Sequence, residues 1–218
     1  MKSAAVDYKK LRLNNISTNE FSHLKLLLYW PIFGLLFVFV ERVYPASHYY
    51  VMHCRADDLI PFCEWFLIPY LFWFVYLIGM HVYTLLYDID AFNRMMKYII
   101  ITYTVTIIIY LLFPTCQELR PTQIERDNIL TRFIVSFYKF DTNTNVCPSI
   151  HVIGSLAVME AALWSGQIKS NWIKAAFVIT ALLICASTVF LKQHSVIDLI
   201  AALPICIFAH FLCYRKRT

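Results

Sequence analysis

Long apolar runs constrain this chain more than any other feature of its sequence. A helix needs about 20 mostly apolar residues to cross the hydrocarbon core of a bilayer. Within that core every backbone polar group must be paired inside a helix or a closed barrel. Six apolar runs follow one another, at roughly 24–40, 61–86, 98–113, 148–164, 172–191 and 196–214. The sequence therefore predicts an all-α bundle of six transmembrane helices, with a charged loop at 88–97 between the second and third.

The composition supports a single integral membrane domain over residues 1–218. Hydrophobic residues make up 60% of the chain and charged residues 15%, against about 45–50% and 25% in soluble domains. The net charge of +5 is spread over loops and tails without a basic stripe, so nucleic acid is not predicted as a partner. The segment before the first span covers residues 1–23, and its residues 1–19 are polar and lack the apolar core and cleavage site of a signal peptide.

The distribution of Lys and Arg predicts the orientation in the membrane. Six spans place both termini on one side, and cytoplasmic segments carry the excess of Lys and Arg. The side of the termini has twelve of these residues: Lys2, Lys9, Lys10, Arg12, Lys25, Arg94, Lys97, Lys169, Lys174, Arg215, Lys216 and Arg217. The other side has seven: Arg42, Arg55, Arg120, Arg126, Arg132, Lys139 and Lys192. We therefore expect a multi-pass protein of the cell membrane with both termini in the cytoplasm.

The longest connection, 114–147, lies between the third and fourth spans and is expected outside the cytoplasm. Connections of this length in a compact domain are usually functional. Apolar residues recur in it at helical spacing among charged ones: Ile129, Leu130, Phe133, Ile134 and Phe137. The pattern predicts an amphipathic helix. Such a helix either lies on the membrane surface and gates lateral access of a lipid, or simply packs over the bundle.

Two histidines stand at the edges of apolar runs on this same side. His194 precedes Asp198 by four residues, so on one helix face the carboxylate can orient the imidazole and leave its other nitrogen free. Alone, this spacing favours a polar pair that satisfies itself where a helix enters the membrane, because spacing by itself is weak evidence for a catalytic site. His151, at the end of Cys147-Pro148-Ser149-Ile150-His151, adds a second imidazole. Together the two favour a catalytic site.

Three ordered motifs resemble those of the type 2 phosphatidic acid phosphatase superfamily. That family has a Lys-x6-Arg-Pro element, a Pro-Ser-Gly-His element and a Ser-Arg-x5-His-x3-Asp element. Here they correspond to Arg120-Pro121, to Pro148–His151, and to Ser187-Thr188 followed by His194 and Asp198. The resemblance covers about residue 98 to the C-terminus.

The chain departs from the family pattern at three positions. Phe113 stands where the first motif has lysine, Ile150 where the second has glycine, and Thr188 where the third has arginine. Lys192 is a candidate to supply the lost charge. Relaxed motifs of this kind are similar to those of inositol phosphorylceramide and sphingomyelin synthases.

The resemblance implies a role for each matching residue. His194 would attack phosphorus and form a phosphohistidine, with Asp198 orienting its ring, and His151 would act as acid and then base. The substrate phosphate would be bound by Arg120, Ser149 and Lys192, although Arg120 and Lys192 also suit interfacial anchors and Ser149 a helix cap.

We therefore expect a membrane enzyme that hydrolyses a lipid phosphomonoester or pyrophosphate at the extracytoplasmic face. Phosphotransfer of a head group to a lipid alcohol is one alternative. A non-catalytic protein that binds or transports lipid is another. The expected partners are a phosphorylated lipid and the bilayer, and no cofactor or metal is expected, since no Cys-x-x-Cys or His-x-x-x-His spacing occurs.

Four cysteines are expected on or near the outer face, where oxidation is possible. They are Cys54, Cys63, Cys116 and Cys147. One or two disulfides among them are compatible with the sequence, which does not define the pairing.

Overall fold

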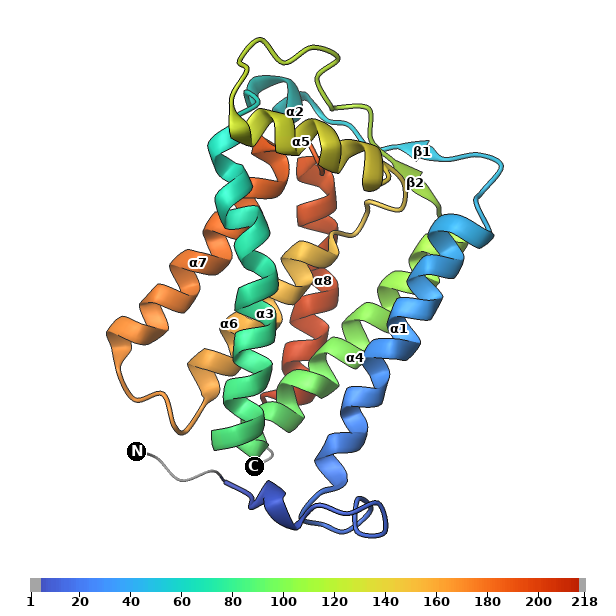
Figure 1. The fold of residues 1–218 in the computed structure, drawn as a ribbon. Coiled ribbons are helices and arrows are strands. Elements are labelled where there is room, and N and C mark those ends of the chain that lie inside the picture. The colour runs from blue at the N-terminus through green and yellow to red at the C-terminus, as the bar shows by residue number, and fades with distance from the viewer. Residues whose placement is uncertain (1–4, 216–218) are drawn as a thin grey trace.

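Long helices run roughly side by side in the computed structural model, which describes residues 5–215 (Figure 1). Both ends of the described chain lie at the same end of the bundle (Figure 1). Three of the basic residues counted for orientation, Lys2, Lys216 and Arg217, lie outside the described residues. The long helices are α1 (Tyr29–Val38), α3 (Leu67–Tyr87), α4 (Ile89–Leu112), α6 (Ile150–Trp164), α7 (Asn171–Phe190) and α8 (Val196–Cys213).

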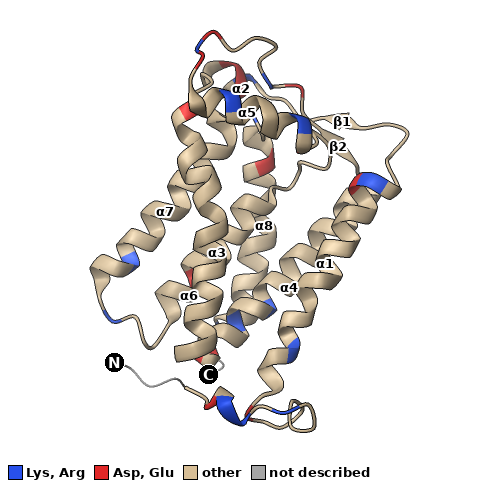
Figure 2. Cartoon of the chain, in the orientation of Figure 1, with Lys and Arg blue, Asp and Glu red and all other residues tan. Residues whose placement is uncertain are grey.

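Five helices of the described chain are long and apolar enough to cross a membrane. The first is a continuous helical run, Ser22–Val43, in which η2 (Ser22–Leu28) and η3 (Phe39–Val43) flank α1. The other four are Glu64–Tyr87, α4, α7 and α8, whereas α6 is apolar but only 15 residues long. Lys, Arg, Asp and Glu gather mainly towards the two ends of the bundle (Figure 2). The chain is therefore a multi-pass membrane protein, and the count of six crossings stays a prediction.

Helix α6 lies at the centre of the bundle and contacts α3, α4, α7 and α8. Small side chains allow these helices to approach closely. Ala157, Ala161 and Ala162 are fully buried, and a Cβ added at Gly154 would lie 2.7 Å from Tyr103 Oη and 3.0 Å from the Trp73 ring. The packing around α6 therefore fixes the position of its first turn, where His151 stands.

The predicted charged loop at 88–97 is wrong, because α4 begins at Ile89. Asp88 is the N-cap, and its carboxylate accepts a hydrogen bond from the backbone N–H of Ala91 at 3.1 Å, which pairs one of the free donors at a helix start. Phe92, Met95 and Met96 are fully buried. The charges of this segment lie on the outer face of a helix whose inner face is apolar. A high density of charged residues was therefore not evidence for a loop here.

The end of the bundle away from the termini is covered by short elements (Figure 1). They are α2 (Arg55–Leu59), η4 (Glu64–Phe66), α5 (Ile129–Phe140) and a two-residue parallel pairing of β1 (Tyr50–Val51) with β2 (Thr115–Cys116). That pairing is a small departure from the all-α prediction. All seven cysteines are free.

Helix α5 occupies the long connection where the periodicity predicts a helix. One face packs on the bundle through Ile134, which is 1% exposed and contacts a cluster containing Leu67 and Tyr70. The opposite face leaves Ile129 and Phe133 exposed. The helix thus packs over the bundle and presents apolar side chains outward, and its position on a membrane surface stays a prediction.

Candidate active site

His194 lies in the turn between α7 and α8 and is held by Asp198. Its Nδ1 is 3.1 Å from Asp198 Oδ2, and because a carboxylate only accepts, Nδ1 carries the proton and Nε2 has the free lone pair. The same Oδ2 accepts from the backbone N–H of Ser195 at 2.9 Å. Asp198 is therefore the third residue of a capping box that starts α8 with Ser195 as N-cap. His194 stands just before the helix rather than on it, and the capping geometry orients the pair.

His151 comes from the first turn of α6 and faces His194. The centroids of the two rings are 5.8 Å apart. Tyr70 and Trp73 of α3 pack on the His151 ring with centroids 4.5 and 4.6 Å away. The ring is thus fixed by aromatic packing, and its buried Nδ1 has no protein partner among the described residues.

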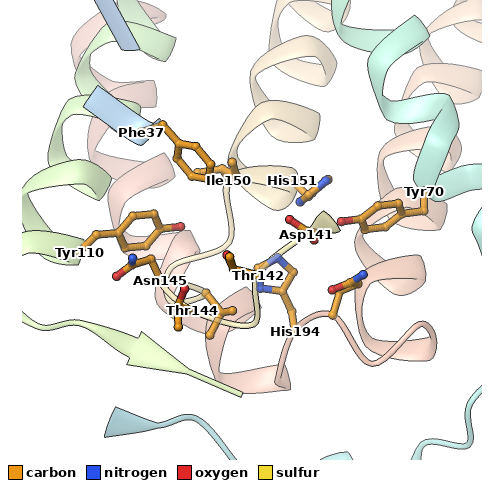
Figure 3. Close-up of a pocket in the computed structure, with 12 residues that line it drawn as sticks. Phe37, Tyr70, Tyr110, Asp141, Thr142, Thr144, Asn145, Ile150, His151 and His194 are labelled. Atoms are coloured by element: carbon orange, nitrogen blue, oxygen red, sulfur yellow. The ribbon is translucent and has the colours of Figure 1, made fainter. Parts of the chain in front are cut away.

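A cavity of about 60 Å³ opens against both histidines (Figure 3). Its walls come from four long helices, from the turn that carries His194 and from the segment after α5. Its lining residues are Phe37, Tyr70, Tyr110, Asp141, Thr142, Thr144, Asn145, Val146, Ile150, His151, Gln193 and His194. A reacting group placed here would meet both imidazoles.

Asp141, at the end of α5, contributes a carboxylate to this cavity. Its nearest cation is Arg120, whose Nη2 lies 3.8 Å from Asp141 Oδ2. Burial raises the pKa of Asp141, and the charge of Arg120 only partly opposes this effect. The carboxylate therefore takes up a proton more easily than an exposed aspartate does.

Arg120 stabilises the segment that follows α5 through hydrogen bonds. Its guanidinium donates to the backbone oxygens of Tyr138, Asp141 and Thr142 at 2.9–3.0 Å and to Gln193 Oε1 at 2.6 Å. It also lies over the Tyr138 ring, 4.6 Å from the centroid, and it does not line the cavity. In this geometry Arg120 acts on the site through Gln193 and the cavity wall, and its contact with a phosphate stays a prediction.

Lys192 and Ser149, the other two predicted phosphate ligands, lie outside the cavity lining. Lys192 Nζ donates to the carbonyl oxygens of Asp57 at 2.7 Å and Ile60 at 2.5 Å. Ser149 is the N-cap of α6, and its buried hydroxyl has no partner among the described residues. Its backbone N–H donates to Asp198 O at 3.1 Å and so joins the starts of α6 and α8.

Asp57 was not predicted as a site residue, yet it supports the turn that carries His194. It is 2% exposed and accepts from Ser195 Oγ at 2.6 Å, from Val196 N at 2.8 Å and from Cys54 N at 2.7 Å. Burial acts to raise the pKa of Asp57, but these hydrogen bonds outweigh it, so the pKa is lowered. The ionised carboxylate therefore stabilises the start of α8.

Glu41, also not predicted, holds the opposite wall of the cavity. Its carboxylate accepts from Asn145 Nδ2 at 2.6 Å, from Thr144 Oγ1 at 3.0 Å and from the Thr142 hydroxyl. All three partners line the cavity. In the sequence Glu41 marks only the end of the first apolar run, and nothing there indicates a contact about a hundred residues along the chain.

Cys147 does not compete with His194 as a nucleophile. Burial, assisted by the charge of Asp198, raises the pKa of Cys147 to about 12. The thiol is therefore protonated at neutral pH, and only a thiolate is strongly nucleophilic. Within residues 5–215 no three His, Cys, Asp or Glu side chains form a group that could hold a metal ion.

The fold and the site define a class: multi-pass helical membrane proteins with a carboxylate-oriented histidine facing a second histidine at one end of the bundle. A family model described as the PAP2 superfamily matches residues 94–218, which is more than half of the chain. The chain belongs to the PAP2 superfamily. Its members are phosphoesterases or phosphotransferases, which supports an enzyme of this kind. Comparisons with curated proteins and with solved structures return no match.

The family match covers only part of the cavity. The matched range, 94–218, contains all six predicted site residues: Arg120, Ser149, His151, Lys192, His194 and Asp198. Glu41, Asp57 and Tyr70 precede it. Walls and supports of the site therefore also come from the first 93 residues, which the family model does not cover.

Proposed function

We propose that this protein is a membrane enzyme that cleaves the phosphate ester of a lipid through a phosphohistidine on His194. One observation carries the proposal: His194 Nδ1 is bonded to Asp198 at 3.1 Å, which leaves Nε2 unprotonated beside a cavity that also contains His151. Oriented imidazole pairs of this kind support nucleophilic and acid–base catalysis.

In this reaction each residue has one task. His194 Nε2 attacks phosphorus while the bond from phosphorus to the lipid oxygen breaks, and His151 gives its proton to the leaving alkoxide. Asp198 stabilises the positive charge that forms on the His194 ring. In the second half, His151 takes a proton from an incoming water or alcohol, whose oxygen displaces His194 from phosphorus.

Hydrolysis and transfer use the same residues and differ in the acceptor. Water gives free phosphate or phosphorylated head group, and a lipid alcohol gives a new phospholipid. Transfer is the second candidate because the positions of the family's motif lysine and motif arginine hold Phe113 and Thr188, as the resemblance to sphingolipid synthases implies.

We also propose that the site faces the outside of the cell membrane and that both termini face the cytoplasm. The excess of Lys and Arg at the end of the termini supports this orientation. Selective labelling of a tag at either terminus in intact and in permeabilised cells tests it. Labelling without permeabilisation would contradict it.

The enzyme proposal is tested with purified protein in lipid nanodiscs. A panel of lipid phosphates is incubated with and without a chelator, and free phosphate, released lipid alcohol and new phospholipid are measured. We expect turnover that survives the chelator, falls to background in His194→Ala and drops by about 10² to 10⁴ in His151→Ala.

His53→Ala is the matched control for these variants. His53 is exposed, pairs with Asp58 at 2.8 Å and does not line the cavity, so this variant should retain turnover. Full turnover in His194→Ala would reject the proposed mechanism. Loss of all activity with the chelator would reject its independence of metal.

A further inference from the structure

Gln193, which stands directly before His194, has one half of its side-chain amide paired and the other half free. The residue lines the cavity and is 3% exposed. Its Oε1 accepts a hydrogen bond from Arg120 Nη2 at 2.6 Å, whereas its Nε2 is buried without a partner among the described residues. Buried polar groups are almost always paired in folded proteins. A buried amide nitrogen left unpaired beside a cavity therefore indicates a bond that a ligand completes.

Arg120 fixes the direction of this amide. A guanidinium only donates hydrogen bonds, so the oxygen of Gln193 must face Arg120 and its NH2 group must face away. Arg120 is itself held by three backbone oxygens, those of Tyr138, Asp141 and Thr142, and it does not line the cavity. The free N–H groups of Gln193 are therefore directed away from the arginine, towards the side of the cavity.

The backbone holds Gln193 and His194 together. The N–H groups of both residues donate to one acceptor, Thr188 O, at 2.9 and 3.1 Å. Lys192, just before them, has a φ of 54°, in the left-handed conformation that turns the chain after α7. Two neighbouring residues bound to one carbonyl oxygen have little freedom to move apart. A phosphoryl group on His194 is therefore held next to the Gln193 amide.

Several other donors of the cavity wall are already in use. The charge of a transferring phosphoryl group is spread over its equatorial oxygens, which preorganised donors stabilise. No Lys or Arg occurs among the described residues that line the cavity. Thr142, Thr144 and Asn145 line it, but their hydroxyls and Nδ2 donate to the Glu41 carboxylate. Gln193 Nε2 is a buried donor without such a partner, and it is available to the phosphate.

We propose that Gln193 is a catalytic residue whose Nε2 donates a hydrogen bond to a non-bridging oxygen of the phosphate that His194 attacks, and that Arg120 is the positioning residue that orients this amide. The inference rests on the proposed function and adds a phosphate ligand to it. A neutral amide thereby stabilises the phosphate in a chain that holds Phe113 and Thr188 where the family motifs have cations.

Two variants of Gln193 separate the donor from structural support. Gln193→Met removes the donor without adding charge. Gln193→Glu keeps an oxygen for Arg120 but replaces Nε2 with an atom that only accepts. With the lipid phosphate that the wild type turns over fastest in nanodiscs, we expect kcat to fall by about 10² to 10³ in both variants, as when one oxyanion donor is removed. If Gln193 only supported Arg120, Gln193→Glu would retain the kcat of the wild type.

Gln117→Met is the matched control. Gln117 is also fully buried, and its Nε2 is unpaired among the described residues, but it does not line the cavity. This variant should therefore keep the kcat of the wild type. Thermal unfolding followed by tryptophan fluorescence checks the fold of each variant. Gln193→Glu, which keeps the bond to Arg120, decides the result if Gln193→Met does not fold.

A double-mutant cycle tests the role of Arg120. Lysine keeps the charge but lacks the fork of donors that binds the backbone oxygens and the amide together, so Arg120→Lys should lower kcat with less change in KM. If Arg120 acts through Gln193, Arg120→Lys combined with Gln193→Met should lose no more than Gln193→Met alone. Losses that add would indicate a direct contact of Arg120 with the phosphate and would contradict its positioning role.

Orthovanadate measures the same contact without turnover, because it mimics the five-coordinate phosphorus of the transition state. By isothermal titration calorimetry we expect its affinity to be about tenfold weaker in Gln193→Met than in the wild type, a difference of about 1.4 kcal/mol. The affinity should be unchanged in Gln117→Met. Unchanged vanadate affinity in Gln193→Met, or full kcat in either Gln193 variant, would overturn the inference.

Failure of this inference and failure of the proposed function give different results. If the Gln193 variants are fully active but turnover still requires His194, the proposed mechanism survives and only the role of Gln193 is wrong. If His194→Ala is active, both fail. If no lipid phosphate of the panel reacts, the proposed function fails, and the vanadate affinity of Gln193→Met still decides whether the amide binds a phosphate-like anion.

Discussion

Asp57→Asn is the substitution that tests most sharply how the turn with His194 is held. The Asp57 carboxylate accepts three hydrogen bonds, from Ser195 Oγ, Val196 N and Cys54 N. Hydrogen bonds to a buried charged group contribute about 1.5–3 kcal/mol each. Asparagine keeps the shape but replaces one acceptor oxygen with a donor, which must face one of these donors. We expect a loss of about 2–3 kcal/mol in the free energy of unfolding.

The free energy of unfolding that is lost in Asp57→Asn should depend on pH in a defined direction. Because the folded-state pKa of Asp57 is lowered, its contribution is present above the unfolded-state pKa of about 3.9. It is lost as the pH falls through the lower, folded-state pKa. The difference between wild type and Asp57→Asn should therefore be largest near neutral pH and shrink on acidification. The measurement is equilibrium unfolding in mixed micelles, followed by tryptophan fluorescence.

Asp58→Asn is the matched control for this experiment. Asp58 neighbours Asp57, but its side chain is 63% exposed and pairs with an exposed His53. Substitutions at such sites usually change stability by less than about 0.5 kcal/mol. Equal stability of Asp57→Asn and Asp58→Asn at neutral pH would refute the assigned role of Asp57.

Two further predictions concern the packing of α6 and the walls of the cavity. Gly154→Ala places a Cβ 3.0 Å from the Trp73 ring and should cost about 1–3 kcal/mol by overpacking, whereas Gly79→Ala, with nothing within 4 Å, should not destabilise the protein in the same unfolding assay. Glu41→Gln weakens the charge-assisted bonds to Thr142, Thr144 and Asn145, and steady-state kinetics should show a KM raised severalfold with less change in kcat.

The sequence predicts those parts of the fold that depend on local pattern. Apolar runs located the long helices, and helical spacing located α5 within the long connection. The start of α4 was missed because the charged residues of segment 88–97 suggested a loop. Phe92 and Met95 of this segment are buried, but that they share one helix face is clear only from the structure. Periodicity within a short charged stretch is too weak to decide this.

The candidate site divides in the same way. His194 and Asp198 are four residues apart, so their contact is encoded locally, and His151 lies in a motif of its own. Glu41, Asp57 and Asp141 reach the site through contacts with residues about a hundred positions or more away, or through the path of a loop. Carboxylates at the ends of apolar runs usually mark solvated ends, so the sequence contains no signal that distinguishes these three. The cations at Arg120 and Lys192 were visible, but their protein partners were not.

Chemical trapping of the reaction intermediate tests the central claim most directly. The purified enzyme is mixed with a lipid labelled in its phosphate, quenched within the first turnover and digested under alkaline conditions, which preserve phosphohistidine. We predict acid-labile label on the peptide that contains His194 in wild type and in His53→Ala, and none in His194→Ala. Label on another residue, or turnover without any labelled enzyme in the first cycle, would contradict nucleophilic catalysis by His194.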